Sequence, residues 1–135
     1  MTKKVLIIED EADVMEYLNT VLENNGYRTY TSSDAEEALS MAGEVVPDLI
    51  CLDIMMPRES GLSFYTQLKK MKGLKNIPVV IVSGAIQQGE FDFRSFVPDE
   101  TIAPPERFIE KPIVIEDFLE TVAELTSRSR TGKKG

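Results

Sequence analysis

The feature of this sequence that most limits its possible folds is a wholly apolar run, Leu49–Leu52, followed directly by Asp53. A continuous apolar run of this length is typical of a strand buried on both faces, as at the centre of a parallel sheet. In open parallel sheets, ligands bind at the carboxyl ends of the strands. A carboxylate that follows such a strand is therefore a candidate for chemistry as well as for structure.

Three more predicted strands are followed by polar residues in the same way. Val5–Ile8 is followed by Glu9 and Asp10, Pro78–Val82 by Ser83, and Arg107–Glu110 by Lys111. If the four strands are parallel neighbours, one edge of a single sheet gathers all of these polar side chains beside Asp53. Carboxylates, a hydroxyl group and a lysine can together hold a divalent cation and a phosphoryl group.

Other segments show helical or edge-strand patterns. Val14–Leu22 has apolar residues at helical spacing and is followed by a stop signal at Asn25–Gly26. Ile115–Leu125 has the clearest later apolar stripe and predicts a final helix. Tyr27–Thr31 alternates and is rich in β-forming residues, so a second strand is expected there, at the edge of the sheet.

Two further helices are predicted between the strands. Ser33 and Glu36 have the spacing of a capping box at the start of one helix, which Gly43 would end. Ser60 can cap the other helix. The apolar face of this second helix would carry Phe64, Leu68 and Met71. The alternation of strands and helices implies a parallel sheet with right-handed crossovers and helices on both faces.

The composition excludes several classes of protein. A chain of 135 residues is one ordinary domain, and 23 acidic against 15 basic residues, a net charge of −8, argue against binding to nucleic acid or an anionic membrane. The absence of histidine excludes a Ser-His-Asp triad, a histidine zinc ligand and a histidine phosphate carrier within this chain. The single cysteine, Cys51, indicates a reducing compartment. We expect neither a signal peptide nor a membrane span.

Five short motifs occur in order along the chain. They are Glu9–Asp10, Asp53–Pro57, Gly61, Ser83–Ala85 and Phe108–Pro112. Together they resemble the motifs of the receiver domain of bacterial two-component response regulators, and the resemblance covers residues 4–126. It implies a flavodoxin-like, doubly wound α/β fold with a five-stranded parallel sheet in the strand order 2-1-3-4-5.

The resemblance also implies a metal site and a phosphoacceptor. Asp53 would accept a phosphoryl group, and Mg²⁺ would be held by Asp10, Asp53 and the backbone carbonyl of Met55, with Glu9 behind a coordinated water. For Glu9 and Asp10 a plainer interpretation is that acids are favoured at the start of a helix. That interpretation does not suit Asp53, because Asp53 follows an apolar strand and no helix is predicted to begin directly after it.

Three more residues have roles implied by the resemblance. Lys111 and Ser83 would contact the phosphoryl oxygens. Ser83 and Phe108 would form a switch, in which the aromatic side chain turns inward when the hydroxyl group moves toward the phosphate. The plainer alternatives are a solvated lysine, a turn serine and a core phenylalanine.

The segment between Ser83 and Lys111 departs from the family. It is longer than usual and contains Gly89, Pro98 and Pro104–Pro105, so an atypical fourth helix region is expected. Receiver domains generally dimerise, or contact their output protein, through the face that this segment forms. Formation of a homodimer therefore stays open, and the family's rules for output are not applied to this chain.

These features predict a stand-alone receiver, residues 1–126, followed by a disordered basic tail, residues 127–135. The chain would be a cytoplasmic switch that a histidine kinase or phosphotransfer protein phosphorylates on Asp53, and it would catalyse only its own phosphorylation and dephosphorylation. Signalling would occur by contact with an output protein. One alternative is a phosphate-independent interaction module that uses the altered fourth segment. The other alternative is a Mg²⁺-dependent phosphatase, but phosphatases of this kind normally need a second acid at the position where this chain has Met55.

Overall fold

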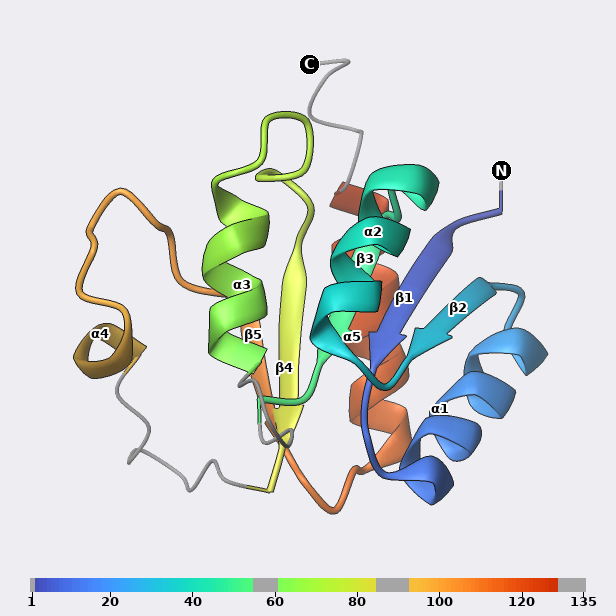
Figure 1. The fold of residues 1–135 in the computed structure, drawn as a ribbon. Coiled ribbons are helices and arrows are strands. Elements are labelled where there is room, and N and C mark those ends of the chain that lie inside the picture. The colour runs from blue at the N-terminus through green and yellow to red at the C-terminus, as the bar shows by residue number, and fades with distance from the viewer. Residues whose placement is uncertain (1, 55–60, 85–92, 129–135) are drawn as a thin grey trace.

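The computed structural model describes residues 2–54, 61–84 and 93–128 (Figure 1). Its strands are β1 (Lys4–Ile8), β2 (Arg28–Ser32), β3 (Leu49–Leu52), β4 (Val79–Ser83) and β5 (Arg107–Glu110). Its helices are α1 (Ala12–Asn24), α2 (Ala35–Val45), α3 (Gly61–Lys69), α4 (Phe93–Phe96) and α5 (Ile115–Arg128). Strands and helices alternate along the chain, as the apolar runs predict.

The strands form one parallel sheet in the order β2-β1-β3-β4-β5, which confirms the expected fold and strand order. The strand expected at the edge, β2, lies there. In the centre, Ile8 of β1 pairs with Leu52 of β3. The residues that follow these two strands therefore lie beside one another at the carboxyl edge of the sheet.

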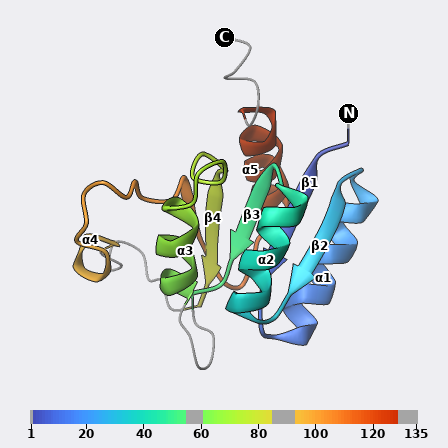
Figure 2. The ribbon, with the colours of Figure 1, turned by 45° about the horizontal axis from the view of Figure 1, so that its top comes forward.

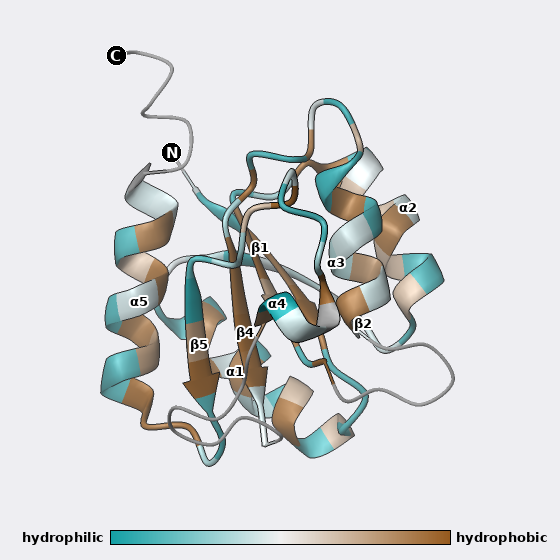
Figure 3. Cartoon of the chain, turned by 90° about the vertical axis from the view of Figure 1, so that its left-hand side faces the viewer, coloured by the Kyte–Doolittle hydropathy of each residue, from teal (hydrophilic) through white to brown (hydrophobic). Residues whose placement is uncertain are grey.

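Helices cover both faces of the sheet, with α1 and α5 on one face and α2 and α3 on the other (Figures 1 and 2). Side chains of the central strands alternate between the two layers. Val5 and Ile7 of β1 pack in the cluster that contains α1 and α5, whereas Leu6 and Ile8 pack in the cluster with α2 and α3. All four are buried. Figure 3 shows β4 as an apolar strand, and every residue of β3 and β4 is buried, which confirms the predicted burial on both faces.

The two most regular helices agree with the predicted apolar stripes. Helix α1 ends just before Gly26, whose φ of 90° lies in the left-handed region that glycine adopts without strain. In α5, Phe118 and Val122 are fully buried, and the helix continues through Arg128, into the predicted tail. Residues 129–135 of that tail lie outside the described residues. Within the described ranges, no helix has the length and apolar character needed to cross a bilayer.

Both predicted ends of α2 are wrong. The cap is Asp34, whose carboxylate accepts a hydrogen bond from the backbone N–H of Glu37 at 2.9 Å, and not Ser33. Serine and aspartate cap helices about equally well, so the pattern did not distinguish the two neighbours. Gly43 lies inside the helix, which stops instead at Val46, a residue with a left-handed φ of 50°.

Replacing Val46 with glycine is expected to stabilise the protein by about 0.5–1 kcal/mol. The left-handed conformation costs an L-residue with a Cβ atom roughly 1–2 kcal/mol, and glycine removes most of this strain while losing some backbone entropy on folding. Urea denaturation measures the change. The matched control is Glu44→Gly, an exposed substitution inside α2 that should lower the stability by about 1 kcal/mol. A similar loss in both variants would show that Val46 is not strained.

Helix α3 is shorter than the apolar pattern predicts. Phe64 and Leu68 are buried, but Met71 lies beyond the helix end and is 37% exposed, so its predicted place on the apolar face is wrong. The helix ends at Lys69, whose ammonium group donates to two backbone carbonyl groups of the following turn. The predicted cap, Ser60, lies outside the described residues.

The fourth helix region is atypical, as predicted. In the described part of this region, from residue 93 onward, helix α4 spans four residues, and the ring of Phe93 packs edge-on against Tyr65 of α3 with a centroid distance of 5.5 Å. The guanidinium group of Arg94 donates to three backbone carbonyl groups within residues 97–102. The Tyr65 hydroxyl group donates to the carbonyl oxygen of Ala103. Arg94 therefore fixes the shape of the loop after α4, and the Tyr65 hydrogen bond ties that loop to α3.

Candidate functional site

The carboxyl edge of the sheet brings together polar residues from four strands. Glu9 follows β1, Asp53 follows β3, Ser83 ends β4 and Lys111 follows β5. Backbone hydrogen bonds tie these strand ends together: Asp53 N–H donates to the carbonyl oxygen of Ile8 at 3.0 Å, and Lys111 N–H donates to that of Ser83 at 3.3 Å. The residues expected to gather at one edge of the sheet do so.

Three carboxyl groups form a cluster at this edge. Glu9, Asp10 and Asp53 each present an oxygen atom within 4.8 Å of those of the other two. Glu9 and Asp53 are buried, with exposed fractions of 1% and 3%, while Asp10 is partly exposed. Negative charges this close together repel one another, so a cation bound among them is favoured.

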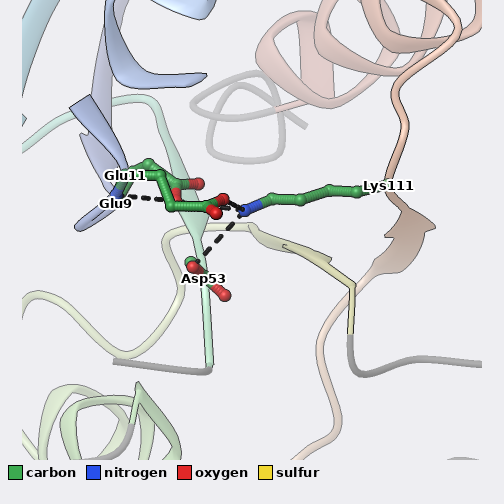
Figure 4. Close-up of polar contacts among 4 residues, drawn as sticks. All are labelled: Glu9, Glu11, Asp53 and Lys111. Atoms are coloured by element: carbon green, nitrogen blue, oxygen red, sulfur yellow. Dashed lines mark hydrogen bonds and ion pairs between the residues drawn. The ribbon is translucent and has the colours of Figure 1, made fainter. Parts of the chain in front are cut away.

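Lys111 supplies a positive charge opposite the cluster (Figure 4). Its ammonium nitrogen lies 3.0 Å from a carboxylate oxygen of Glu9, 3.5 Å from one of Asp53 and 2.8 Å from one of Glu11. The Lys111 side chain is only 16% exposed. It is therefore not the freely solvated lysine of the plainer interpretation.

Glu11 is a residue of this site that the sequence pattern did not single out. It occupies the N-cap position of α1, but its side chain makes no capping hydrogen bond. Its backbone N–H donates to Glu9 Oε2 at 3.2 Å, and its carboxylate reaches Lys111. The only signal was a third acid after Glu9 and Asp10, which the helix dipole explains equally well.

Burial and charge shift the ionisation of two groups in the site. The pKa of Glu9 is raised to about 7, chiefly by burial and further by the charge of Asp53, while the hydrogen bond from Lys111 acts in the opposite direction. Burial lowers the pKa of Lys111, but its contacts with Glu11 and Glu9 outweigh burial and raise that pKa above its ordinary value. Lys111 is therefore a permanent cation, and the surrounding acids outnumber it.

Ser83 and Phe108 lie on neighbouring strands near the same edge. Ser83 is fully buried and pairs with Glu110, while Phe108 pairs with Ile81. Phe108 is 38% exposed, so the interpretation of this residue as a plain core phenylalanine is wrong. Met55, whose backbone carbonyl the family resemblance assigns to the metal site, lies outside the described residues.

The sequence is similar to known signalling proteins along most of its length. The response regulator receiver domain family matches residues 5–123. The polar-differentiation response regulator DivK of Brucella ovis is 36% identical over 124 residues, which cover 90% of this chain and 94% of DivK. The phosphate regulon transcriptional regulatory protein PhoB of Escherichia coli is 31% identical over 133 residues, which cover 89% of this chain and 58% of PhoB.

The fold is also similar to that of solved structures. The signal receiver domain of a signal transduction histidine kinase from Syntrophus aciditrophicus has a TM-score of 0.80 and 29% sequence identity, and the match covers 96% of this chain and 94% of that one. The receiver domain of the Francisella response regulator 1452 has a TM-score of 0.78 and 26% identity, with 96% of this chain covered. The sequence matches and the structural matches thus each cover about nine-tenths or more of this chain.

Proposed function

Because this chain belongs to the response regulator receiver family, we propose that it is a Mg²⁺-dependent phosphoacceptor whose acceptor residue is Asp53. The Asp53 carboxylate would take a phosphoryl group from a partner protein, and the phosphorylated chain would signal by protein contact. The observation that carries the proposal is the position of Asp53. It is 3% exposed, lies beside two other carboxyl groups and has the Lys111 ammonium group 3.5 Å away.

The donor set of the site fits Mg²⁺. Asp10 and Asp53 present carboxylate oxygens to one another, and Glu9 lies close enough to act through a coordinated water. Hard oxygen ligands with some retained waters are what this ion prefers. When bound, Mg²⁺ would offset the negative charge of the carboxylates and of the phosphoryl group.

Transfer to Asp53 requires few protein groups. A carboxylate oxygen of Asp53 attacks the phosphorus of a phosphohistidine, a P–O bond forms as the P–N bond breaks, and the donor nitrogen keeps the electron pair. Lys111 is close enough to Asp53 to donate to a phosphoryl oxygen with a small movement. Ser83, buried at the end of β4, would supply a hydroxyl donor, and Phe108 would respond to its movement.

The proposed phosphodonor is a histidine kinase or a phosphotransfer protein, and the output partner is a protein of unspecified identity. We do not propose activity on other substrates: the chain would catalyse only its own phosphorylation and dephosphorylation. A net charge of −8 disfavours direct binding to nucleic acid. The buried free thiol of Cys51 suits a cytoplasmic location.

Incubation with a small phosphodonor tests this proposal. With phosphoramidate and Mg²⁺, the intact mass of the protein should rise by the mass of one phosphoryl group. The same incubation with a chelator in place of Mg²⁺ should leave the mass unchanged. A protein that stays unmodified in the presence of Mg²⁺ and donor would not be a phosphoacceptor.

Mg²⁺ is expected to raise the melting temperature, because only the folded chain assembles the three carboxyl groups. At 100 times its Kd, a ligand stabilises the folded state by about 2.7 kcal/mol, which corresponds to roughly 10 °C for a domain of this size. Scanning calorimetry measures the shift. Asp10→Asn should reduce it, whereas Asp13→Asn, an exposed substitution outside the cluster, should keep it. Equal shifts in the two variants would place the ion elsewhere.

A phosphate-independent interaction module is the second candidate function. One observation favours it: side-chain hydrogen bonds from Arg94 and Tyr65 hold the loop after α4 in a defined conformation, which a partner could recognise without phosphate. The two functions differ in what a partner would recognise. A partner that binds the phosphorylated protein and the Asp53→Ala variant equally tightly would support the module.

A further inference from the structure

Lys111 is engaged by more carboxylates than the proposed phosphoryl transfer requires. An ammonium group has three N–H donors. Three carboxylate oxygens surround the Lys111 nitrogen, at 2.8 Å from Glu11, 3.0 Å from Glu9 and 3.5 Å from Asp53 (Figure 4). The shortest contact is therefore to Glu11, which lies outside the cluster of three carboxyl groups that could hold a metal.

Glu11 differs from the other two acids in its exposure. Its side chain is 60% exposed, whereas those of Glu9 and Asp53 are 2% and 3% exposed. The backbone of Glu11 is fixed by its hydrogen bond to Glu9, so the side chain meets Lys111 at the solvent side of the site. A contact between a lysine and an exposed carboxylate is weak and is readily exchanged.

We infer that Glu11 is a positioning residue that holds Lys111 in the unphosphorylated chain and competes with the incoming phosphoryl group for its ammonium. This inference rests on the proposed function. The phosphoryl oxygens and the Glu11 carboxylate are rival acceptors for the same N–H donors, so Lys111 must exchange one for the other as Asp53 is phosphorylated. Glu11 thereby slows phosphorylation and limits how far Lys111 stabilises the product.

The Glu11→Gln variant tests the competition, because it keeps the size of the side chain and removes its charge. Its initial rate of phosphorylation by phosphoramidate should exceed that of the parent about two- to fivefold, the range expected from the loss of one partly exposed ion pair. Asp13→Asn is the matched control. Asp13 is exposed and lines the same surface depression as Lys111, but it forms no ion pair with Lys111 among the described residues. Its removal should leave the rate within error of the parent.

A second readout reports on Lys111 itself and needs no phosphoryl transfer. The rate at which an amine-specific acylating reagent labels Lys111 is measured by peptide mass spectrometry. In Glu11→Gln this rate should rise several-fold, because the ammonium group has lost its shortest contact, and in Asp13→Asn it should not change. Melting temperatures close to that of the parent show that both variants are folded.

Each outcome decides the question. Equal acceleration in Glu11→Gln and Asp13→Asn would overturn the inference, because a general loss of negative charge would explain both results. Unchanged labelling of Lys111 in Glu11→Gln would overturn it as well. If the parent takes up no phosphoryl group, the proposed function fails and the inference falls with it. If the parent is phosphorylated and Glu11→Gln behaves like the parent, only the inference fails.

Discussion

Replacing Asp53 with alanine is expected to abolish the phosphoryl adduct completely. Asp53 is the buried acid at the end of the central strand β3, with Lys111 beside it and the other acids around it. The nearby hydroxyl group of Ser83 is a weak nucleophile unless a base activates it, so it should not replace the lost carboxylate. Intact mass after incubation with phosphodonor and Mg²⁺ measures the effect.

The loss of the adduct should not result from unfolding. Removing Asp53 leaves the contacts of Lys111 with Glu9 and Glu11 and takes one negative charge out of a repelling cluster. The melting temperature of Asp53→Ala without Mg²⁺ should therefore stay close to that of the parent. Asp53→Asn, which keeps the shape of the side chain, should also lack the adduct. A phosphoryl mass on either variant would move the acceptor to another residue.

Replacing Gly61 with alanine is expected to lower the stability by about 1–3 kcal/mol, a cost typical of overpacking. A Cβ atom at Gly61 would lie 2.5 Å from the backbone oxygen of Asp53 and 2.7 Å from the Cα atom of Ile54. Both are backbone atoms, so no change of rotamer relieves the contact. The start of α3 or the end of β3 must move, and the melting temperature should fall by several degrees.

Gly43→Ala is the matched control for this substitution. Gly43 lies within α2, and a Cβ atom there would meet nothing within 4 Å. Alanine is favoured over glycine in a helix interior by about 0.5–1 kcal/mol, so this variant should be more stable than the parent. Because the β3 end carries Asp53, Gly61→Ala should also slow phosphorylation, and Gly43→Ala should not. Equal stability of the two variants would mean that α3 and β3 are not in close contact at Gly61.

The sheet and most of the site could be predicted because both depend on strong, local sequence signals. Leu49–Leu52 has apolar residues on both faces, which only a central strand can bury, and the observed burial of all four agrees. The residue that follows such a strand must lie at the carboxyl edge, so Asp53 could be placed without knowing the strand order. The order itself came from the family resemblance.

Other features could not be predicted because the local signals allowed more than one outcome. Ser33 and Asp34 are adjacent residues with similar capping ability, and the backbone geometry selects the second. Gly43 is tolerated inside a helix, so it does not mark the end of α2. The contact of Glu11 with Lys111 joins residues 100 positions apart in the chain, and no periodic pattern records such a pair.

The most direct test of the central claim is to locate the phosphoryl group on the chain. The phosphorylated protein is treated with borohydride, which reduces an aspartyl phosphate to homoserine, and the peptides are then sequenced by tandem mass spectrometry. Homoserine should appear at position 53 and at no other aspartate. Homoserine at another position, or phosphate that survives reduction on Ser83, would contradict the assignment of Asp53 as the phosphoacceptor.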